Sequence, residues 1–318
     1  MRYDVFNGDA DGLCAVQQFR LAFPAESELV TGVKRDIALL KRVAANSGDE
    51  VNVFDISLDK NRESLSSLLA QGVEVKYFDH HFAGDIPADS NFDAHIDTTP
   101  DTCTSLIVDQ FLNGRYRAWA VVGAFGDNFD DSARRAAEPL GLNEEQLSLM
   151  RDLGVYLNYN GYGATVEDLH FDPAELSRRM AGYEDPLQFI EQEPDVFETL
   201  RKGSVEDFAK AEATEPSIVN DKVAVFLFPA EPWARRVSGV FSNKLASANP
   251  DRAHALLTEL PQGGYVVSVR APLNNKTGAD DLCRQFPSGG GRKAAAGINE
   301  LPAAMYDEFV AAFKAIYA

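Results

Sequence analysis

The feature that most constrains this chain is the alternation of short apolar runs with helical patterns along its first hundred residues. The apolar runs occupy residues 3–6, 51–56 and 73–78. Between the first two, Leu13, Val16 and Phe19 recur at three-residue intervals and form one apolar stripe, as on an amphipathic helix. Strands that alternate with helices favour an α/β fold in which a parallel sheet carries helices on its faces.

The remainder of the chain predicts a second, smaller domain. From about residue 184 to 216 the sequence is polar and proline-punctuated around a helical stretch, which we interpret as a connector. Strand-like runs follow at 223–228, 253–260 and 265–269, and an amphipathic helix is expected at 304–317. We therefore expect an N-terminal domain at 1–183, a connector at 184–216 and a mixed α/β domain at 217–318.

The charge is unevenly distributed between these parts. The chain carries a formal net charge of −19; residues 1–215 hold 19 Lys and Arg against 40 Asp and Glu, and residues 216–318 hold 11 against 9. An acidic domain can hold metal cations, and a slightly basic one can meet an anionic substrate. The acidic total disfavours tight binding to duplex nucleic acid, which depends on neutralising many phosphates. A small anion is the better candidate partner.

Composition also bounds the compartment and the cysteine chemistry. No stretch of eighteen apolar residues and no signal peptide is visible, so we expect no membrane span and a cytoplasmic protein. The three cysteines are widely spaced and include no Cys-x-x-Cys pair, which excludes the usual zinc and redox motifs. Oligomeric state does not follow from the sequence.

Acidic residues follow the predicted strands. Asp9 and Asp11 lie in a glycine-bounded turn after the first run, Asp55 follows the second, and Asp79 follows the third. Ligands of an open parallel sheet gather beyond the carboxyl ends of its strands, and carboxylates there suit hard divalent cations. Taken alone, the Asp9–Asp11 turn is equally explained as an ordinary strand-to-helix turn with a capping aspartate.

The triplet Asp79-His80-His81 is harder to explain by packing, because the whole chain has only 5 histidines. A neutral imidazole is a good metal ligand, and a second imidazole can donate to a phosphate or protonate a leaving group. A further carboxylate, Asp127, ends an apolar segment at a glycine turn. Asp130 and Asp131 lie close by and are alternatives for the same role.

These four ordered segments resemble the DHH phosphoesterase superfamily, whose signature is an Asp-x-Asp turn, a strand-end Asp, the Asp-His-His triplet and a later Asp. Residues 288–297, Ser-Gly-Gly-Gly-Arg-Lys-Ala-Ala-Ala-Gly, are similar to the glycine-rich stretch of the associated DHHA1 domain. Together the motifs span almost the whole chain. Several motifs in the expected order are more specific evidence than any single match.

The resemblance implies a centre of two metal ions, usually Mn²⁺, with Mg²⁺ as the alternative. The implied metal ligands are Asp9, Asp11, Asp55, His80 and Asp127, with Asn7 as a further candidate. Asp55 would bridge the ions. Asp79 would orient the triplet, so that His81 faces the substrate phosphate.

The resemblance also implies a substrate-binding face in the C-terminal domain. Arg270 lies in a Ser-x-Arg segment that family members use on substrate, and Gly289, Gly290 and Gly291 would bring backbone amides to a phosphate. The chain departs from the family at two positions that are usually histidine. Asn7 stands two residues before the first motif aspartate, and Arg292 follows the glycines, where a guanidinium can bind phosphate bidentately.

The function that the resemblance implies is hydrolysis of linear dinucleotides such as pGpG, or of very short oligonucleotides, to mononucleotides, as in an oligoribonuclease. Two metal ions would activate water for in-line displacement. One alternative is an exopolyphosphatase-type phosphohydrolase, a branch in which asparagine is also seen in the first motif. Another is a catalytically weakened sensor that binds nucleotide without turnover.

A polar cluster at residues 157–161 contains Asn158, Asn160 and Gly161. Family members often close the site at this position, and a simple turn explains the cluster almost as well.

Overall fold

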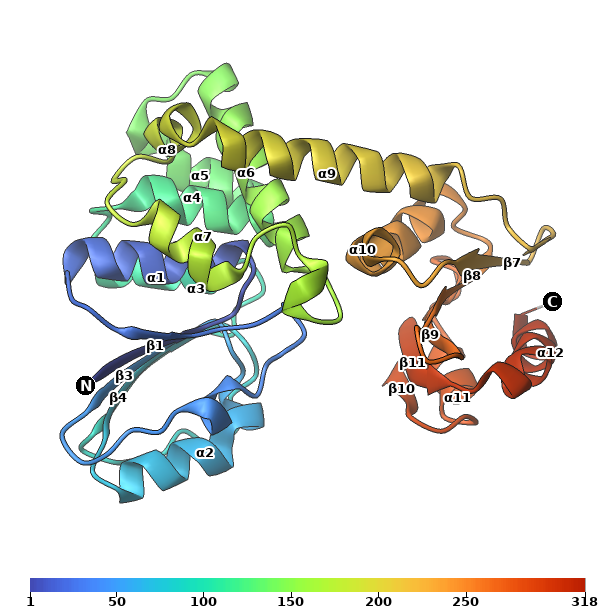
Figure 1. The fold of residues 1–318 in the computed structure, drawn as a ribbon, viewed down its shortest axis with the longest axis horizontal. Helices are drawn as coiled ribbons and strands as arrows, with labels where there is room; N and C mark the ends of the chain where they lie inside the picture. Colours follow the sequence, from blue (N-terminus) through green and yellow to red (C-terminus); the bar gives the residue numbers. More distant parts are fainter. Residues whose placement is uncertain (318) are drawn as a thin grey trace. The chain divides into compact units, whose positions relative to one another are not determined.

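The computed structural model describes residues 1–317, which form two compact units that divide between Gly203 and Ser204 (Figure 1). That division falls inside the segment 184–216, which the sequence suggested as a connector. Most of this segment is helical, as α8 (Pro186–Gln192) and α9 (Pro194–Glu212).

The N-terminal unit is built on a five-stranded sheet in the order β2-β1-β3-β4-β5. Every neighbouring pair of strands is parallel, so the predicted fold class is confirmed for this unit. The strands are β1 (Arg2–Phe6), β2 (Glu28–Val30), β3 (Glu50–Phe54), β4 (Glu74–Asp79) and β5 (Phe92–Ile96). The sequence predicted β1, β3 and β4 but not the edge strands, because β2 has only three residues and β5 is partly exposed.

Alternating side chains give this sheet two apolar faces. Phe54 and Phe78 stack on neighbouring strands with ring centroids 5.5 Å apart and join the core that includes α1 (Ala10–Ala22). Val53 and Tyr77 point the other way, into a core with α2 (Leu58–Ala70). Burial on both faces is usual for a parallel sheet and explains why its strands read as almost continuous apolar runs. Figure 1 shows α1 and α2 on opposite sides of the sheet.

Further helices join α1 on its side of the sheet. They are α3 (Thr104–Phe111), α4 (Arg117–Gly126), α5 (Asp130–Ala137), α6 (Glu144–Gly161) and α7 (Pro173–Met180). Short 3-10 turns complete the unit at η1 (Leu39–Arg42), η2 (Glu138–Leu140) and η3 (Val166–Asp168). Asn158 and Gly161 lie in the last turn of α6, so the interpretation of 157–161 as a turn is wrong.

Small residues let these helices approach closely. A Cβ at Gly154 of α6 would lie 2.3 Å from the carbonyl oxygen of Val122 and 2.8 Å from the amide nitrogen of Gly126, both in α4. A Cβ at Gly126 would lie 2.3 Å from that of Ala10 in α1. Since Asp127 directly follows Gly126 and Asp9 directly precedes Ala10, this packing sets the spacing of two site carboxylates.

The C-terminal unit has a six-stranded sheet in the order β10-β11-β9-β8-β7-β6. The β7–β8 pair is parallel and the other pairs are antiparallel, as predicted for a mixed domain. The strands are β6 (Ile218–Val219), β7 (Val223–Phe228), β8 (Ala253–Glu259), β9 (Tyr265–Arg270), β10 (Gly289–Arg292) and β11 (Ala295–Leu301). The other elements are α10 (Pro232–Ala248), α11 (Ala279–Cys283), η4 (Ala303–Met305) and α12 (Tyr306–Tyr317). Across residues 1–317, every helix is too short or too polar to serve as a membrane span.

The first prediction concerns the close contact between α4 and α6. Gly154→Ala places a methyl group against the α4 backbone, and overpacking of this kind costs about 1–3 kcal/mol. We expect that loss in the free energy of unfolding, measured by urea denaturation. Gly239→Ala is the control, because a Cβ at this helical glycine meets no atom within 4 Å. The control should be neutral or stabilising by up to about 1 kcal/mol. Equal effects of the two changes would contradict the packing argument.

Candidate metal centre

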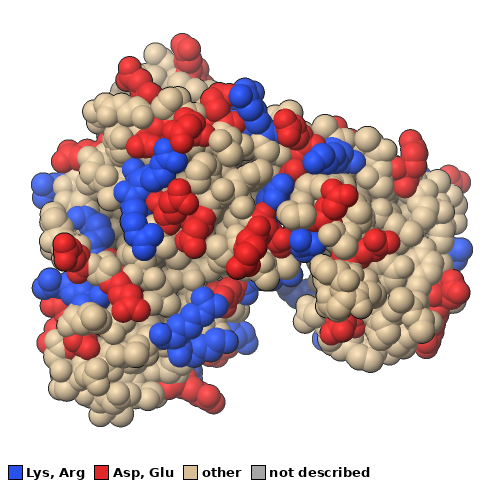
Figure 2. Space-filling view, viewed as in Figure 1, with Lys and Arg blue, Asp and Glu red and all other residues tan. Residues whose placement is uncertain are grey.

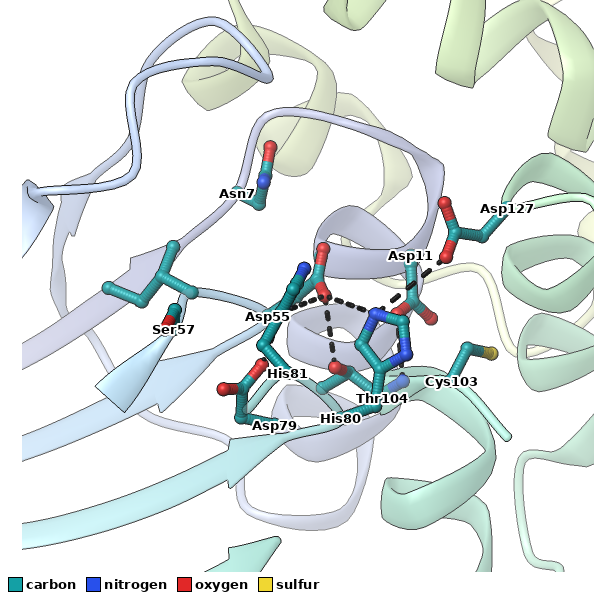
Figure 3. A network of polar contacts seen from close by, with 12 residues as sticks. Asn7, Asp11, Asp55, Ser57, Asp79, His80, His81, Cys103, Thr104 and Asp127 are labelled. Atoms are coloured by element: carbon teal, nitrogen blue, oxygen red, sulfur yellow. Dashed lines mark hydrogen bonds and ion pairs between the residues drawn. The ribbon is translucent and has the colours of Figure 1, made fainter. Parts of the chain in front are cut away.

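Carboxylates from four separate sequence segments lie together at the carboxyl edge of the N-terminal sheet (Figure 3). Asp55 directly follows β3, and Asp79 is the last residue of the neighbouring strand β4. Asp9 is the N-cap residue of α1, and Asp127 is the C-cap residue of α4. Adjacent parallel strands end at the same edge, so their terminal residues meet there.

Asp11 is held by the N-terminus of α3. Its two carboxylate oxygens accept hydrogen bonds of 2.7 Å from the backbone amides of Thr104 and Ser105. These amides have no partner within their helix, and they carry the positive end of its dipole. The Thr104 hydroxyl donates to Asp55 Oδ1 at 3.1 Å. The start of α3 therefore stabilises two site carboxylates at once.

Asp55 has a strained backbone and an unfavourable electrostatic environment. Its φ of 59° lies in the left-handed region, which non-glycine residues rarely adopt and which is enriched at functional sites. Burial, followed by repulsion from Asp9, Asp11, Asp127 and Asp79, raises the pKa of Asp55 well above its usual value. A bound cation would relieve this repulsion.

The two triplet histidines have different surroundings. His80 Nε2 lies 3.5 Å from Asp55 Oδ1 and 3.7 Å from Asp127 Oδ2, whereas its Nδ1 lies 3.2 Å from the Thr102 carbonyl oxygen. His81 Nδ1 lies 2.7 Å from Asp79 Oδ1, and 43% of the His81 side chain is exposed. Burial alone would lower the pKa of His81, but the hydrogen bond and the charge of Asp79 outweigh it and raise that pKa.

Asp79 is buried and acts through His81. One carboxylate oxygen holds His81 Nδ1, and the other is buried without a hydrogen-bond partner. Two groups of side chains in residues 1–317 could hold an ion, and Asp79 belongs to neither of them. Its geometry is that of a positioning residue for His81.

Lys34, which the sequence did not single out, lies among the carboxylates. Its Nζ is 2.6 Å from Asp9 Oδ2, 3.0 Å from Asp127 Oδ1 and 2.9 Å from Asn158 Oδ1. Burial alone would lower the pKa of Lys34, but attraction by Asp9 and Asp127 outweighs it and raises that pKa well above its usual value. The two carboxylates therefore favour the charged form of Lys34 within the centre.

Asp127, rather than its neighbours, reaches this centre. Asp130 and Asp131 lie in the first turn of α5, and Asp130 Oδ1 pairs with Arg151 Nε at 2.7 Å on the surface. Burial, opposed by Lys34, raises the pKa of Asp127. The alternative roles for Asp130 and Asp131 receive no support from this arrangement.

Asn7 is buried and lies apart from the carboxylate cluster in Figure 3. Its Nδ2 donates to the backbone carbonyl of Lys34 at 3.3 Å, and its Oδ1 has no hydrogen-bond partner. In this arrangement Asn7 secures the Lys34 segment and contributes to neither of the ion-holding groups.

The donor set fits a divalent cation. Two groups bring their ligand atoms within 4.8 Å of one another: Asp55 with His80 and His81, and Asp11 with His80 and Asp127. Carboxylate oxygen with imidazole nitrogen suits Mn²⁺ and related ions. Five aspartates face one lysine here, so the centre retains uncompensated negative charge. Asp9 belongs to neither group; its Oδ1 accepts from the Gly12 amide and its Oδ2 contacts Lys34.

Apart from His81, the residues expected to bind substrate lie in the C-terminal unit. Arg270 Nε donates to Asn243 Oδ1 at 2.7 Å and Nη1 to Ser268 Oγ at 2.9 Å. No carboxylate within residues 1–317 pairs with Arg270, and burial lowers the pKa of its guanidinium. The guanidinium also donates to the backbone carbonyls of Val269 and Gly239 at 3.1 and 3.5 Å, so all its present partners are neutral and an anion would replace them with a charged one.

The glycine-rich segment forms strand β10 at the edge of the C-terminal sheet, paired with β11 through Gly290 and Gly297 among others. A Cβ at Gly289 would lie 1.8 Å from the Cys283 carbonyl, and Gly291 has a φ of 141° with no room for a Cβ. A Cβ at Gly290 would meet no atom within 4 Å, and the Arg292 side chain is exposed. An edge strand leaves the outward backbone amides available to a ligand.

Sequence reasoning missed Lys34, Thr104 and Ser105. Lys34 follows strand β2 and obeys the same strand-end rule that identified the aspartates, but a three-residue strand gives no pattern to follow. Thr104 and Ser105 act largely through backbone amides, which carry no residue-type signal.

Comparisons with known proteins agree with this fold. No family model matches the chain, and no curated protein matches its sequence. Solved structures do match. Manganese-bound exonuclease RecJ superposes with a TM-score of 0.68 at 18% identity, covering 99% of this chain and 89% of that one. RecJ from Thermus thermophilus, in complex with Mn²⁺, gives 0.63 at 20% identity, and the match covers 99% of this chain but 52% of that one.

A third match is the pGpG-specific phosphodiesterase PggH from Vibrio cholerae, with a TM-score of 0.54 at 12% identity, covering 98% of this chain and 97% of that one. At these identities the matches establish fold. The chain thus has the two-domain α/β fold of these DHH/DHHA1 proteins, which confirms at the level of fold the resemblance seen in its motifs. The chain spans about half of the Thermus RecJ and nearly all of PggH.

The second prediction tests the charge balance at Asp55. Asp55→Asn removes one charge from a crowded cluster and keeps the side-chain volume. In EDTA we expect a higher melting temperature than for the unsubstituted protein, by about 2–4 °C for each kcal/mol of relieved repulsion. With Mn²⁺ the order should reverse, because the variant loses an ion ligand.

Asp85→Asn is the matched control, since Asp85 is exposed and carries the same charge. It should follow the unsubstituted protein in both conditions. A melting temperature for Asp55→Asn that falls in EDTA would show that Asp55 is stabilised by its neighbours rather than repelled by them.

Proposed function

We propose that this chain is a divalent-metal-dependent phosphoesterase that hydrolyses linear dinucleotides such as pGpG, or very short oligonucleotides, to mononucleotides. The observation that carries the proposal is the convergence of Asp11, Asp55 and Asp127 with His80 at one sheet edge, beside a positioned His81. The similarity in fold to RecJ and PggH supports the same chemistry. Mn²⁺ is the proposed metal and Mg²⁺ the alternative.

The residues of the centre divide the chemical work. A divalent ion held by Asp11, His80 and Asp127, the group that leaves His81 free, would supply Lewis-acid stabilisation of charge at phosphorus and lower the pKa of water. Asp79 holds His81 Nδ1, which leaves His81 Nε2 to donate to a phosphate oxygen or a leaving group. The hydrogen bond to Asp79 and its charge raise the pKa of His81, which is the direction that an acid role requires.

Substrate size follows from charge. Acidic and basic side chains are interspersed on the face in Figure 2 instead of forming one broad basic patch, and the chain as a whole has a net charge of −19. A long polyanion would be repelled by this field, whereas a dinucleotide needs only a few cationic contacts. Arg270, Arg292 and the amides of Gly289, Gly290 and Gly291 are the proposed contacts for its phosphates.

The third prediction is a substrate panel with Mn²⁺ that contains pGpG, pApA, a longer oligonucleotide, a cyclic dinucleotide and polyphosphate. We expect mononucleotide release from the linear dinucleotides, and loss of that activity in the double variant Asp79→Ala, His80→Ala. Phosphate release from polyphosphate would favour the exopolyphosphatase alternative. Dinucleotide that is bound but recovered intact would favour the nucleotide sensor.

The fourth prediction concerns Arg270. Arg270→Gln should raise the KM for pGpG about 10- to 100-fold, the loss expected for a charge-assisted hydrogen bond to phosphate. Mn²⁺ affinity should not change, because Arg270 belongs to the other unit. Arg284→Gln is the control, since that side chain is 61% exposed and pairs with Asp280. Equal KM values for Arg270→Gln and the control would exclude Arg270 from substrate binding.

A further inference from the structure

Lys34 fills a position that the metal-dependent function would assign to an ion. Its Nζ has three acceptors, namely Asp9 Oδ2, Asp127 Oδ1 and Asn158 Oδ1, at 2.6, 3.0 and 2.9 Å. An ammonium group has three protons, so each donor has a partner. The Lys34 side chain is 25% exposed, and a cation so placed is fully satisfied by the protein.

The backbone holds Lys34 in place from both sides. Its amide donates to the Gly161 carbonyl oxygen at 2.8 Å, and its own carbonyl accepts from Asn7 Nδ2 at 3.3 Å. Gly161 ends α6, the helix that also carries Asn158. The lysine is therefore a built part of the centre, and Asn7 supports it.

Both oxygens of Asp9 already have protein partners, and the partner of Oδ2 is the Lys34 ammonium, whose positive charge opposes a second cation. Oδ1 accepts from the Gly12 amide at 3.0 Å as the cap of α1, and Oδ2 binds Lys34. Asp127 differs, because Oδ1 binds Lys34 but Oδ2 faces His80 Nε2 at 3.7 Å. Asp127 thus offers an ion an oxygen that faces His80 away from Lys34, whereas an ion at Asp9 must compete with the ammonium for Oδ2.

The two ion-holding groups compete for one nitrogen. Both include His80, and Nδ1 of His80 is directed at the Thr102 carbonyl, which leaves Nε2 as the ligand atom. A single imidazole nitrogen binds one ion. As arranged, the centre accepts one divalent ion without rearrangement.

We infer that Lys34 is a resident cation that competes with a second divalent ion for Asp9. The first ion binds at the His80 side while the ammonium stays. A second ion reaches Asp9 only by displacing Lys34, so the two ions bind with unequal affinity. This inference rests on the proposed metal-dependent function and adds an internal competitor to it.

The test is Mn²⁺ binding by calorimetry and equilibrium dialysis, which needs no turnover. For the unsubstituted protein we expect one ion to bind at least about tenfold more tightly than the second, since breaking a buried ion pair is costly. In Lys34→Met the second ion should bind at least about tenfold more tightly than it does in the unsubstituted protein. Lys41→Met removes the same charge from an exposed position of the same unit and should leave both affinities unchanged.

The inference would be overturned if the unsubstituted protein bound two ions with equal affinity. It would also be overturned if Lys34→Met left the affinity for the second ion unchanged. Either result would leave the hydrolytic function intact. Binding of no ion by any variant would overturn both. If Lys34→Met does not fold without metal, Asn158→Ala provides the test, because it removes one acceptor of the ammonium and keeps its charge. The second ion should then bind more tightly, and an unchanged affinity would overturn the inference.

Discussion

The interaction on which this structure depends is the repulsion among carboxylates gathered at one edge of a buried parallel sheet. Asp55 is repelled there by Asp9, Asp11, Asp127 and Asp79, and like charges in a poorly solvated site cannot all remain ionised without compensation. The protein supplies part of the compensation through Lys34, the first amides of α3 and the imidazole of His81. The negative charge that remains uncompensated favours binding of a divalent cation.

The scaffold places these groups through backbone contacts more than through side chains. Strand ends position Asp55 and Asp79, helix caps position Asp9 and Asp127, and a helix N-terminus holds Asp11. Gly154 and Gly126 allow the helices to approach until Ala10 and Gly126 are in contact. The geometry of the centre is therefore coupled to the packing of the core beneath it.

Much of the fold and of the centre could be predicted from sequence because the signals were local. The apolar runs at residues 51–56 and 73–78 identified strands, and a polar residue after each strand identified a site position. Lys34 could not be found in this way, because β2 is too short to leave a pattern. Asn7 was expected as a ligand from its place in the motif. Only the tertiary structure reveals that its amide is directed at the Lys34 backbone.

The glycines at 289–291 were expected to approach a phosphate. In the structure they pair with β11, a strand that the sequence did not predict.

The most direct test of the central claim is the location of bound manganese. Crystals grown with Mn²⁺ can be measured at the manganese absorption edge, where an anomalous difference map locates the ion independently of the protein phases. We expect a peak bounded by Asp11, His80 and Asp127, with the Lys34 ammonium still beside Asp9 when one ion is bound. A map without a peak at this sheet edge, at Mn²⁺ concentrations that support hydrolysis, would contradict the assignment of the metal centre.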